Sequence, residues 1–357
     1  MRLYKWELKK LVSAPAVWVF LALCAAFNIL IIAENSYESA WANEISREIA
    51  RTGERRYTDR EDIFMGYDTS YLADVFVKAF RLRGGSEALM RGKYERLQAV
   101  VRRNAEAAVS LDIYADGATY EAHRSLFRKT LFPIFTESIL FAVLSALYTL
   151  GYEHQQKTEP LVYGTRTGRA VTRHKRAAAL TAAACGFALL AALTLAVHFA
   201  VWDFSGLWNS NVSGMMNYVI DEPGTRPFIT WANLNVAQYL AAVLALGFAL
   251  TVVFSLIGSV TGLLTGNTYY GFMVVFLLCA LLLTSVFFFA EAGLGWGMMV
   301  STFTPVAAWF SSRIWLTDMG GWGFIPFHET TVVLGSLALL SIIVMLASRR
   351  FLRKDVL

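Results

Sequence analysis

The stretch of sequence that decides the fold is PFITWANLNVAQYLAAVLALGFALTVVFSLIGSVTGLLTGNTYYGFMVVFLLCALLLTSVFFFA, which occupies residues 227–290. Its 64 residues include no Asp, Glu, Lys or Arg. About 20 apolar residues cross the hydrocarbon core of a bilayer as a helix, so this stretch has room for two crossings. The polar sequence Gly266-Asn267-Thr268 divides it into 236–264 and 269–290. We therefore expect two membrane helices joined by a tight turn.

Four further charge-poor runs flank this stretch, and each is long enough for one membrane helix. The whole chain is 56% hydrophobic and 17% charged, where soluble domains have about 25% charged residues. The sequence thus predicts an all-α polytopic membrane protein with six transmembrane helices and a helical insert between the first and second. The four runs are 11–33, 130–152, 177–202 and 330–348. The predicted segments are an interfacial amphipathic helix at 1–12, the first transmembrane helix at 13–33, the insert at 34–129, and transmembrane helices two to six within 130–357.

One more charge-free segment, 292–312, is interpreted differently. It contains Gly293, Gly295, Gly297 and Pro305 together with several Ser and Thr residues. Because this composition is poor for a continuous helix, we expect an interfacial or re-entrant segment and not a seventh span.

The distribution of basic residues predicts the orientation, because short segments rich in Lys and Arg stay in the cytoplasm. With six spans, the N-terminal segment, the loop 153–176 and the C-terminal tail fall on one side. They carry 14 Lys and Arg residues, against 2 in the short loops opposite. We expect a multi-pass protein of the cell membrane with both termini in the cytoplasm. The net charge of +5 reflects this topology, and no basic surface interleaved with aromatic residues indicates nucleic acid binding.

The insert of 96 residues carries 16 basic and 16 acidic residues, and loops of this length are translocated largely regardless of charge. Apolar stripes at helical spacing run through 41–49, 72–79 and 90–108, and Gly84-Gly85 separates the second from the third. We expect an extracytoplasmic helical subdomain that packs on itself or on a partner. The alternative is that these helices merely extend the membrane spans outward.

Motifs for chemistry are largely missing from the sequence. Gly92-Lys93 is followed by Tyr94 instead of Ser or Thr, so no phosphate-binding loop for a nucleotide is present. The three cysteines all lie in predicted spans, and no two histidines are four residues apart, so neither a disulfide framework nor a metal site is indicated. We therefore predict no enzymatic activity and no directly bound cofactor.

Two polar residues within the spans are candidates for an intramembrane site. Glu137 lies about two turns inside the second span, and His198 lies near the outer end of the third. An ionisable group in hydrocarbon is costly and often marks a pathway, so substrate or proton handling is one interpretation. The other is structural: Glu137 reaches the surface or pairs with Arg128, and His198 is an interfacial histidine.

Small residues indicate helix packing. Gly258, Gly262 and Gly266 repeat at spacing four and would let another helix approach closely. A contact with the fifth span is the favoured interpretation, and self-association of two chains is the alternative.

Three short stretches resemble the membrane permease subunits of ABC-2 type ATP-binding cassette transporters. They are Trp6-Glu7-Leu8-Lys9-Lys10, the second span from Leu131 into Tyr152-Glu153, and the cytoplasmic stretch 159–175 with Gly164-Thr165-Arg166 and Gly168-Arg169. Six spans and a proline-containing segment before the last span also agree with that family.

This resemblance implies a permease, expected to be an exporter of an amphiphilic or peptide-like substrate. It would form a homodimer or heterodimer in the lipid bilayer and use ATP through separate ABC ATPase subunits. The resemblance assigns coupling to the ATPase to Glu153, Gly164, Thr165, Arg166 and Arg169. A membrane-anchored sensor or assembly factor with an extracytoplasmic binding subdomain is the alternative. An intramembrane enzyme using Glu137 or His198 is less favoured, because no nucleophile and base can be paired.

Overall fold

The computed structural model describes residues 2–53, 62–112, 117–165, 168–216 and 227–352. Within these ranges the chain is built of helices, with two isolated β-bridges and no strand. Six of the helices are long and apolar enough to cross a membrane. The fold is thus the all-α polytopic membrane protein that the sequence predicts. The six candidate spans are α2 (Pro15–Glu34), α7 (Leu131–Gln155), α9 (Val171–Val201), α11 (Val236–Thr265), α12 (Thr268–Glu291) and α15 (His328–Leu352).

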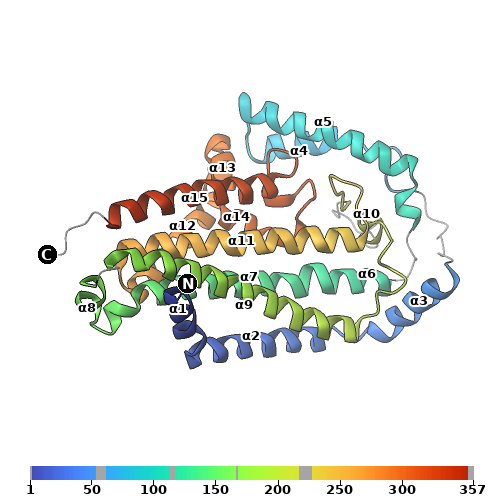
Figure 1. Ribbon diagram of the computed structural model, residues 1–357. Coiled ribbons are helices and arrows are strands. Elements are labelled where there is room, and N and C mark those ends of the chain that lie inside the picture. Colours follow the sequence, from blue (N-terminus) through green and yellow to red (C-terminus); the bar gives the residue numbers. More distant parts are fainter. Residues whose placement is uncertain (1, 54–61, 113–116, 166–167, 217–226, 353–357) are drawn as a thin grey trace.

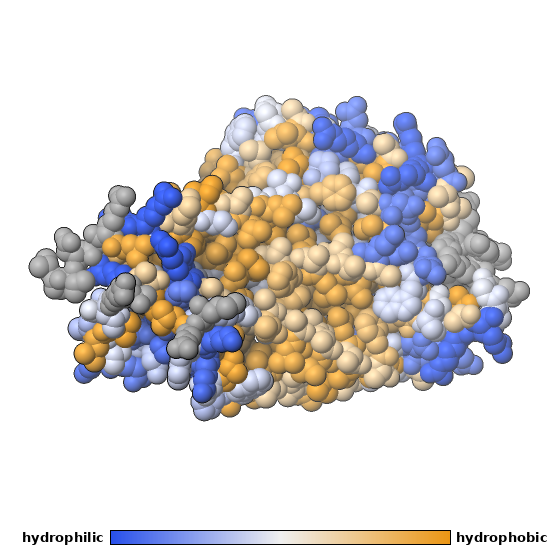
Figure 2. Space-filling view, viewed as in Figure 1, coloured by the Kyte–Doolittle hydropathy of each residue, from blue (hydrophilic) through white to orange (hydrophobic). Residues whose placement is uncertain are grey.

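These spans run side by side as one bundle (Figure 1). Its central member is α7, which packs against both α9 and α11, whereas α2, α12 and α15 lie at the periphery and expose much of their apolar surface. Figure 2 shows hydrophobic side chains gathered over the middle of the bundle and hydrophilic ones at its two ends. A broad apolar belt between two polar ends is what a bilayer requires of a protein that spans it.

The two ends of the bundle carry different short elements (Figure 1). We call one the loop side; it holds α1 (Arg2–Val12), α8 (Glu159–Tyr163) and η3 (Gly168–Ala170). The other, the insert side, holds α3 (Ser39–Thr52), α4 (Ser70–Ala79), α5 (Gly85–Glu106), η1 (Val109–Asp112), α6 (Gly117–Arg124), η2 (Ser125–Thr130), α10 (Val212–Met215), η4 (Ser312–Ile314) and η5 (Gly320–Trp322).

The turn between α11 and α12 lies where the polar sequence predicts it. Gly266 ends α11 in the left-handed conformation, with φ of 63°, which glycine adopts without the strain of a side chain. The Asn267 side chain then caps α12 by accepting the backbone N–H groups of Tyr269 and Tyr270 at 2.9 and 3.3 Å. The two long helices are therefore held as a hairpin.

The segment 292–312 does not cross the membrane as a single helix. It forms two short helices, α13 (Gly295–Thr302) and α14 (Pro305–Phe310), and is not among the six candidate spans. Both helices pack against α12. The expectation that this segment is not a seventh span is confirmed.

The insert combines both arrangements that the sequence leaves open. Helices α4 and α5 pack against one another and share a core with Trp231, Met298 and Phe324 from segments between the later spans. In contrast, α6 and η2 continue directly into α7, so that one helical stretch runs from Thr119 to Gln155. One part of the insert is thus a packed subdomain, and another is an outward extension of a span.

Candidate functional site

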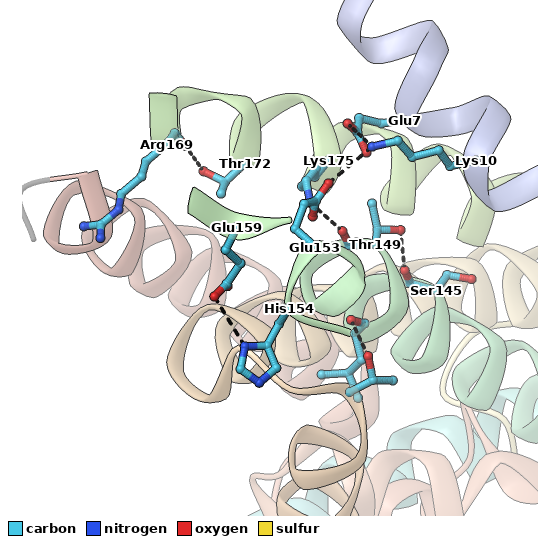
Figure 3. A network of polar contacts seen from close by, with 12 residues as sticks. Glu7, Lys10, Ser145, Thr149, Glu153, His154, Glu159, Arg169, Thr172 and Lys175 are labelled. Carbon is cyan, nitrogen blue, oxygen red and sulfur yellow. Dashed lines mark hydrogen bonds and ion pairs between the residues drawn. The ribbon is translucent and has the colours of Figure 1, made fainter. Parts of the chain in front are cut away.

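A cluster of charged side chains joins three helices on the loop side (Figure 3). Glu153, in the last turn of α7, forms an ion pair with Lys175 of α9. Its other carboxylate oxygen lies 3.2 Å from Nζ of Lys10 on α1, and Lys10 in turn lies 3.0 Å from Glu7. We call these four residues the loop-side network.

Most of the loop-side network is buried, so any unpaired charge in it would be costly in free energy. Glu7, Glu153 and Lys175 are 4%, 1% and 0% exposed, while Lys10 reaches solvent. Buried charges are tolerated when they are paired and hydrogen-bonded, and the two carboxylates here balance two ammonium groups. Lys175 also donates to the backbone carbonyl of Thr149 at 3.0 Å. The network therefore fixes α1, α7 and α9 relative to one another.

A second set of contacts ties the segment after α7 to the last span. The Arg169 guanidinium donates to the Phe351 carbonyl at 3.2 Å and lies over the rings of Tyr163 and Phe351. Burial, followed by the nearby Glu159 carboxylate, raises the pKa of the Tyr163 hydroxyl. The contacts of Arg169 therefore hold α8 and η3 against the end of α15.

The residues assigned to coupling occupy two different environments. Gly164 and Thr165 follow α8 at the surface, where the Thr165 hydroxyl donates to the Val162 carbonyl at 2.7 Å. Arg169 lies in the adjoining η3. Glu153, by contrast, is enclosed among helices and is not part of that surface, because its partners Lys10 and Lys175 draw it into the bundle. Arg166 lies outside the described residues.

Sequence reasoning missed the partners of Glu153. In the sequence, Lys10 and Lys175 indicate the orientation of the protein, and Glu7 belongs with them to stretches that resemble the permease family, but neither pattern pairs any of the three with Glu153. A carboxylate within a basic entry helix, three residues before Lys10, is the signal that was present in the sequence. The pairing itself joins residues 143 positions apart and follows from no local pattern.

Glu137 lies in a buried polar cluster among three spans. Its carboxylate accepts from the Asn28 side-chain amide of α2 at 2.8 Å, and the same amide lies 3.1 Å from the Thr194 hydroxyl of α9. The alternative pairing of Glu137 with Arg128 is not what the structure contains. Asn28, an uncharged residue in the first span, was not singled out from the sequence.

His198 is buried one turn beyond Thr194 and is not in contact with solvent. Its Nδ1 lies 3.2 Å from the Thr130 hydroxyl, and its ring packs among Phe199, Trp202 and Phe204. These contacts fit a structural role in joining η2 to α9. The structure does not bring His198 and Glu137 together as a hydrogen-bonded pair.

The glycine stripe of α11 faces α7 and not its hairpin neighbour α12. A methyl group added at Gly258 would lie 3.0 Å from Ala146 and 3.1 Å from the Val143 backbone, and one at Gly262 would lie 3.0 Å from Leu150. Gly266 has a different role, because its surroundings are open and it caps the helix. The seam is within one chain, but the expected contact with the fifth span is corrected to one with the second.

Within the described ranges, no group of three or more His, Cys, Asp or Glu side chains is placed to hold a metal ion. Comparisons of the chain with protein-family models, with curated proteins and with solved structures find no match.

Proposed function

We propose that this chain is the permease subunit of an ATP-binding cassette exporter of the ABC-2 type, driven by separate ATPase subunits. Its substrate would be amphiphilic or peptide-like. The observation that carries the proposal is the linkage on the loop side. One small surface, α8 with η3, continues from α7, adjoins the start of α9, and is tied through Arg169 to the end of α15. A force on that surface would reach three spans together.

The surface also has features that suit a protein partner. Pro160 and Leu161 are exposed on α8, and Leu161 is 74% exposed although it is apolar. A subunit that bound here would remove this apolar side chain from water. We propose that an ATPase subunit binds here and that its closure on ATP is transmitted through the loop-side network to α1, α7 and α9.

The experiment is purification of the tagged chain from native membranes, followed by reconstitution in vesicles. We expect a protein with a phosphate-binding loop and ATPase activity to purify with it, and ATP-dependent movement of an amphiphile or peptide. Leu161→Gln should reduce ATPase binding by about tenfold, a loss of roughly 1.4 kcal/mol. Leu89→Gln is the matched control, because Leu89 is also an exposed leucine, at 42%, but lies on α5 at the insert side. A chain that purifies alone and moves no compound would contradict the proposal.

The proposal includes an orientation in the cell membrane, with the loop side in the cytoplasm. It rests on the excess of basic residues at that end of the bundle. A cysteine introduced at Leu161 should react with an impermeant maleimide only in inside-out vesicles. A cysteine at Arg102, which is exposed on α5, should react only in right-side-out vesicles. The opposite labelling pattern would reverse the orientation.

One observation favours a sensor as the second candidate. A cavity of about 130 Å³ lies between the insert and the end of α12, and its walls include Phe76, Met90 and Phe287. A small apolar ligand held there would touch both the insert and a span. Binding of such a ligand without ATP-dependent movement of any compound would support the sensor over the permease.

A further inference from the structure

A second cavity, larger and positively charged, opens on the insert side of the bundle. It has a volume of about 670 Å³ and lies between α2 and the continuous helix formed by α6, η2 and α7. We call it the α2–α7 pocket. Four basic side chains line it, against the single carboxylate of Glu137; they are Arg124, Arg128, Lys129 and Arg313.

Three of these four cations have neutral partners. Lys129 donates to the Asn35 side-chain oxygen, Arg128 lies 5.9 Å from the Phe228 ring, and Arg313 lies 4.0 Å from the Phe132 ring. Within the described part of the chain, only Arg124 is paired with a carboxylate, that of Glu121 at 2.6 Å. The pocket therefore keeps most of its positive charge, and the Arg128 Nε is buried with no hydrogen-bond acceptor.

The negative charge of Glu137 lies apart from these cations. It is eight residues from Lys129 along the continuous helix of η2 and α7, which is about 12 Å in a helix, and its carboxylate already accepts from Asn28. The cations of the pocket therefore lie around the end of α2 and the start of α7, and Glu137 lies about two turns further along the helix.

The walls next to the cations are apolar and continuous with a surface that faces lipid. Phe27 and Ile31 of α2 line the pocket together with Phe132. Phe27 is 55% exposed, and Leu23 and Leu30 on the same helix are 66% and 68% exposed. A molecule held by the cations can therefore extend an alkyl chain along α2 without leaving an apolar environment.

We propose that the α2–α7 pocket binds the phosphate headgroup of an anionic membrane lipid, with an acyl chain lying along α2. Guanidinium groups recognise phosphate oxygens through paired N–H donors, so a pocket with three arginines suits an anionic headgroup better than a neutral one. The position of the four cations where the α7 span begins matches the depth of a headgroup. The inference does not depend on transport activity.

The test measures retention of phosphatidylglycerol by the full chain purified in detergent, using native mass spectrometry with phosphatidylcholine as the neutral competitor. The wild-type chain should retain phosphatidylglycerol in preference to phosphatidylcholine. Arg128→Gln/Arg313→Gln should lower that retention about tenfold or more, since it removes two of the four cations that line the pocket. Arg96→Gln/Arg102→Gln removes the same charge from the exposed face of α5 and should retain the lipid as the wild type does.

Competition with millimolar inorganic phosphate distinguishes a lipid site from a site for free anions. A site that binds both the headgroup and an acyl chain should not release the lipid when phosphate is added. Release by phosphate, equal retention of the two lipids, or unchanged retention in the Arg128/Arg313 variant would each overturn the proposal. If that variant does not fold, the lipid preference of the wild type, and its resistance to phosphate, still decide the outcome.

Discussion

Glu153 and Lys175 illustrate how a single buried pair can determine the behaviour of this end of the molecule. Both are almost fully buried, and each has the other as its closest opposite charge. The free energy of such a pair is dominated by the cost of removing two charges from water, so its presence alone does not guarantee a net gain in stability. Removing one member is different, because the remaining charge has lost its partner.

We predict that Glu153→Gln destabilises the folded protein by about 3–5 kcal/mol, because Lys175 is left as a buried, uncompensated charge. The double variant Glu153→Gln/Lys175→Met should recover most of this loss, since no buried charge is then unpaired. The measurement is the midpoint of thermal unfolding in lipid nanodiscs. Glu159→Gln is the matched control: Glu159 pairs with His154 near solvent, and that exposed pair is expected to contribute about 0–1 kcal/mol. Equal midpoints for the two single variants would show that the loop-side network is not a buried charge cluster.

At the scale of elements, the seam between α7 and α11 depends on glycine. Gly258→Ala would place a methyl group 3.1 Å from the Val143 backbone, which has little freedom to move. We predict a loss of about 1–3 kcal/mol from overpacking, partly offset by the better helix propensity of alanine. Gly335→Ala in α15 is the control, because that glycine is exposed and its added methyl meets no atom within 4 Å. In reversible unfolding, the free energy of unfolding of Gly258→Ala should be lower than that of the wild type, and that of Gly335→Ala should be equal or higher. The reverse order would contradict close packing of α7 against α11 at Gly258.

The elements themselves are largely predictable from the sequence, whereas their contacts are not. Charge-free runs predict the spans because hydrocarbon thickness imposes a minimum length, and Gly266-Asn267 marks a turn because of its left-handed cap and side-chain cap. The outward continuation of α7 is only the alternative interpretation of the sequence, since Arg128 and Lys129 precede a charge-poor run and so suggest the end of a span. In the structure, these cations line a pocket, while Leu126 and Phe127 directly before them are buried.

On the scale of the whole molecule, the insert is not an independent body. Its α4 and α5 share one hydrophobic core with segments that precede α11 and α15. Polar contacts reinforce this union, because Lys93 donates to the Gly323 carbonyl at 2.7 Å and Arg103 to the Trp231 carbonyl at 3.4 Å. Apolar stripes in the insert predict that it packs, but they hold no information on which distant segment completes the core. A change that loosens the packing of the insert should therefore also loosen the segments that join the spans.

Trp231 gives the sharpest test of that union. It is 7% exposed, its indole N–H donates to the Thr317 carbonyl at 2.9 Å, and it belongs to the core that contains Tyr94 and Leu97 of α5. We predict that Trp231→Ala costs about 3–5 kcal/mol locally, so that backbone amides of α5 exchange with deuterium faster while those of α11 keep their protection. Tyr71→Ala removes an aromatic ring that is 69% exposed on α4 and should leave the exchange of α5 unchanged. If α5 were protected equally in Trp231→Ala and the wild type, the insert would hold its own core, and a signal in it would have no packed route to the spans.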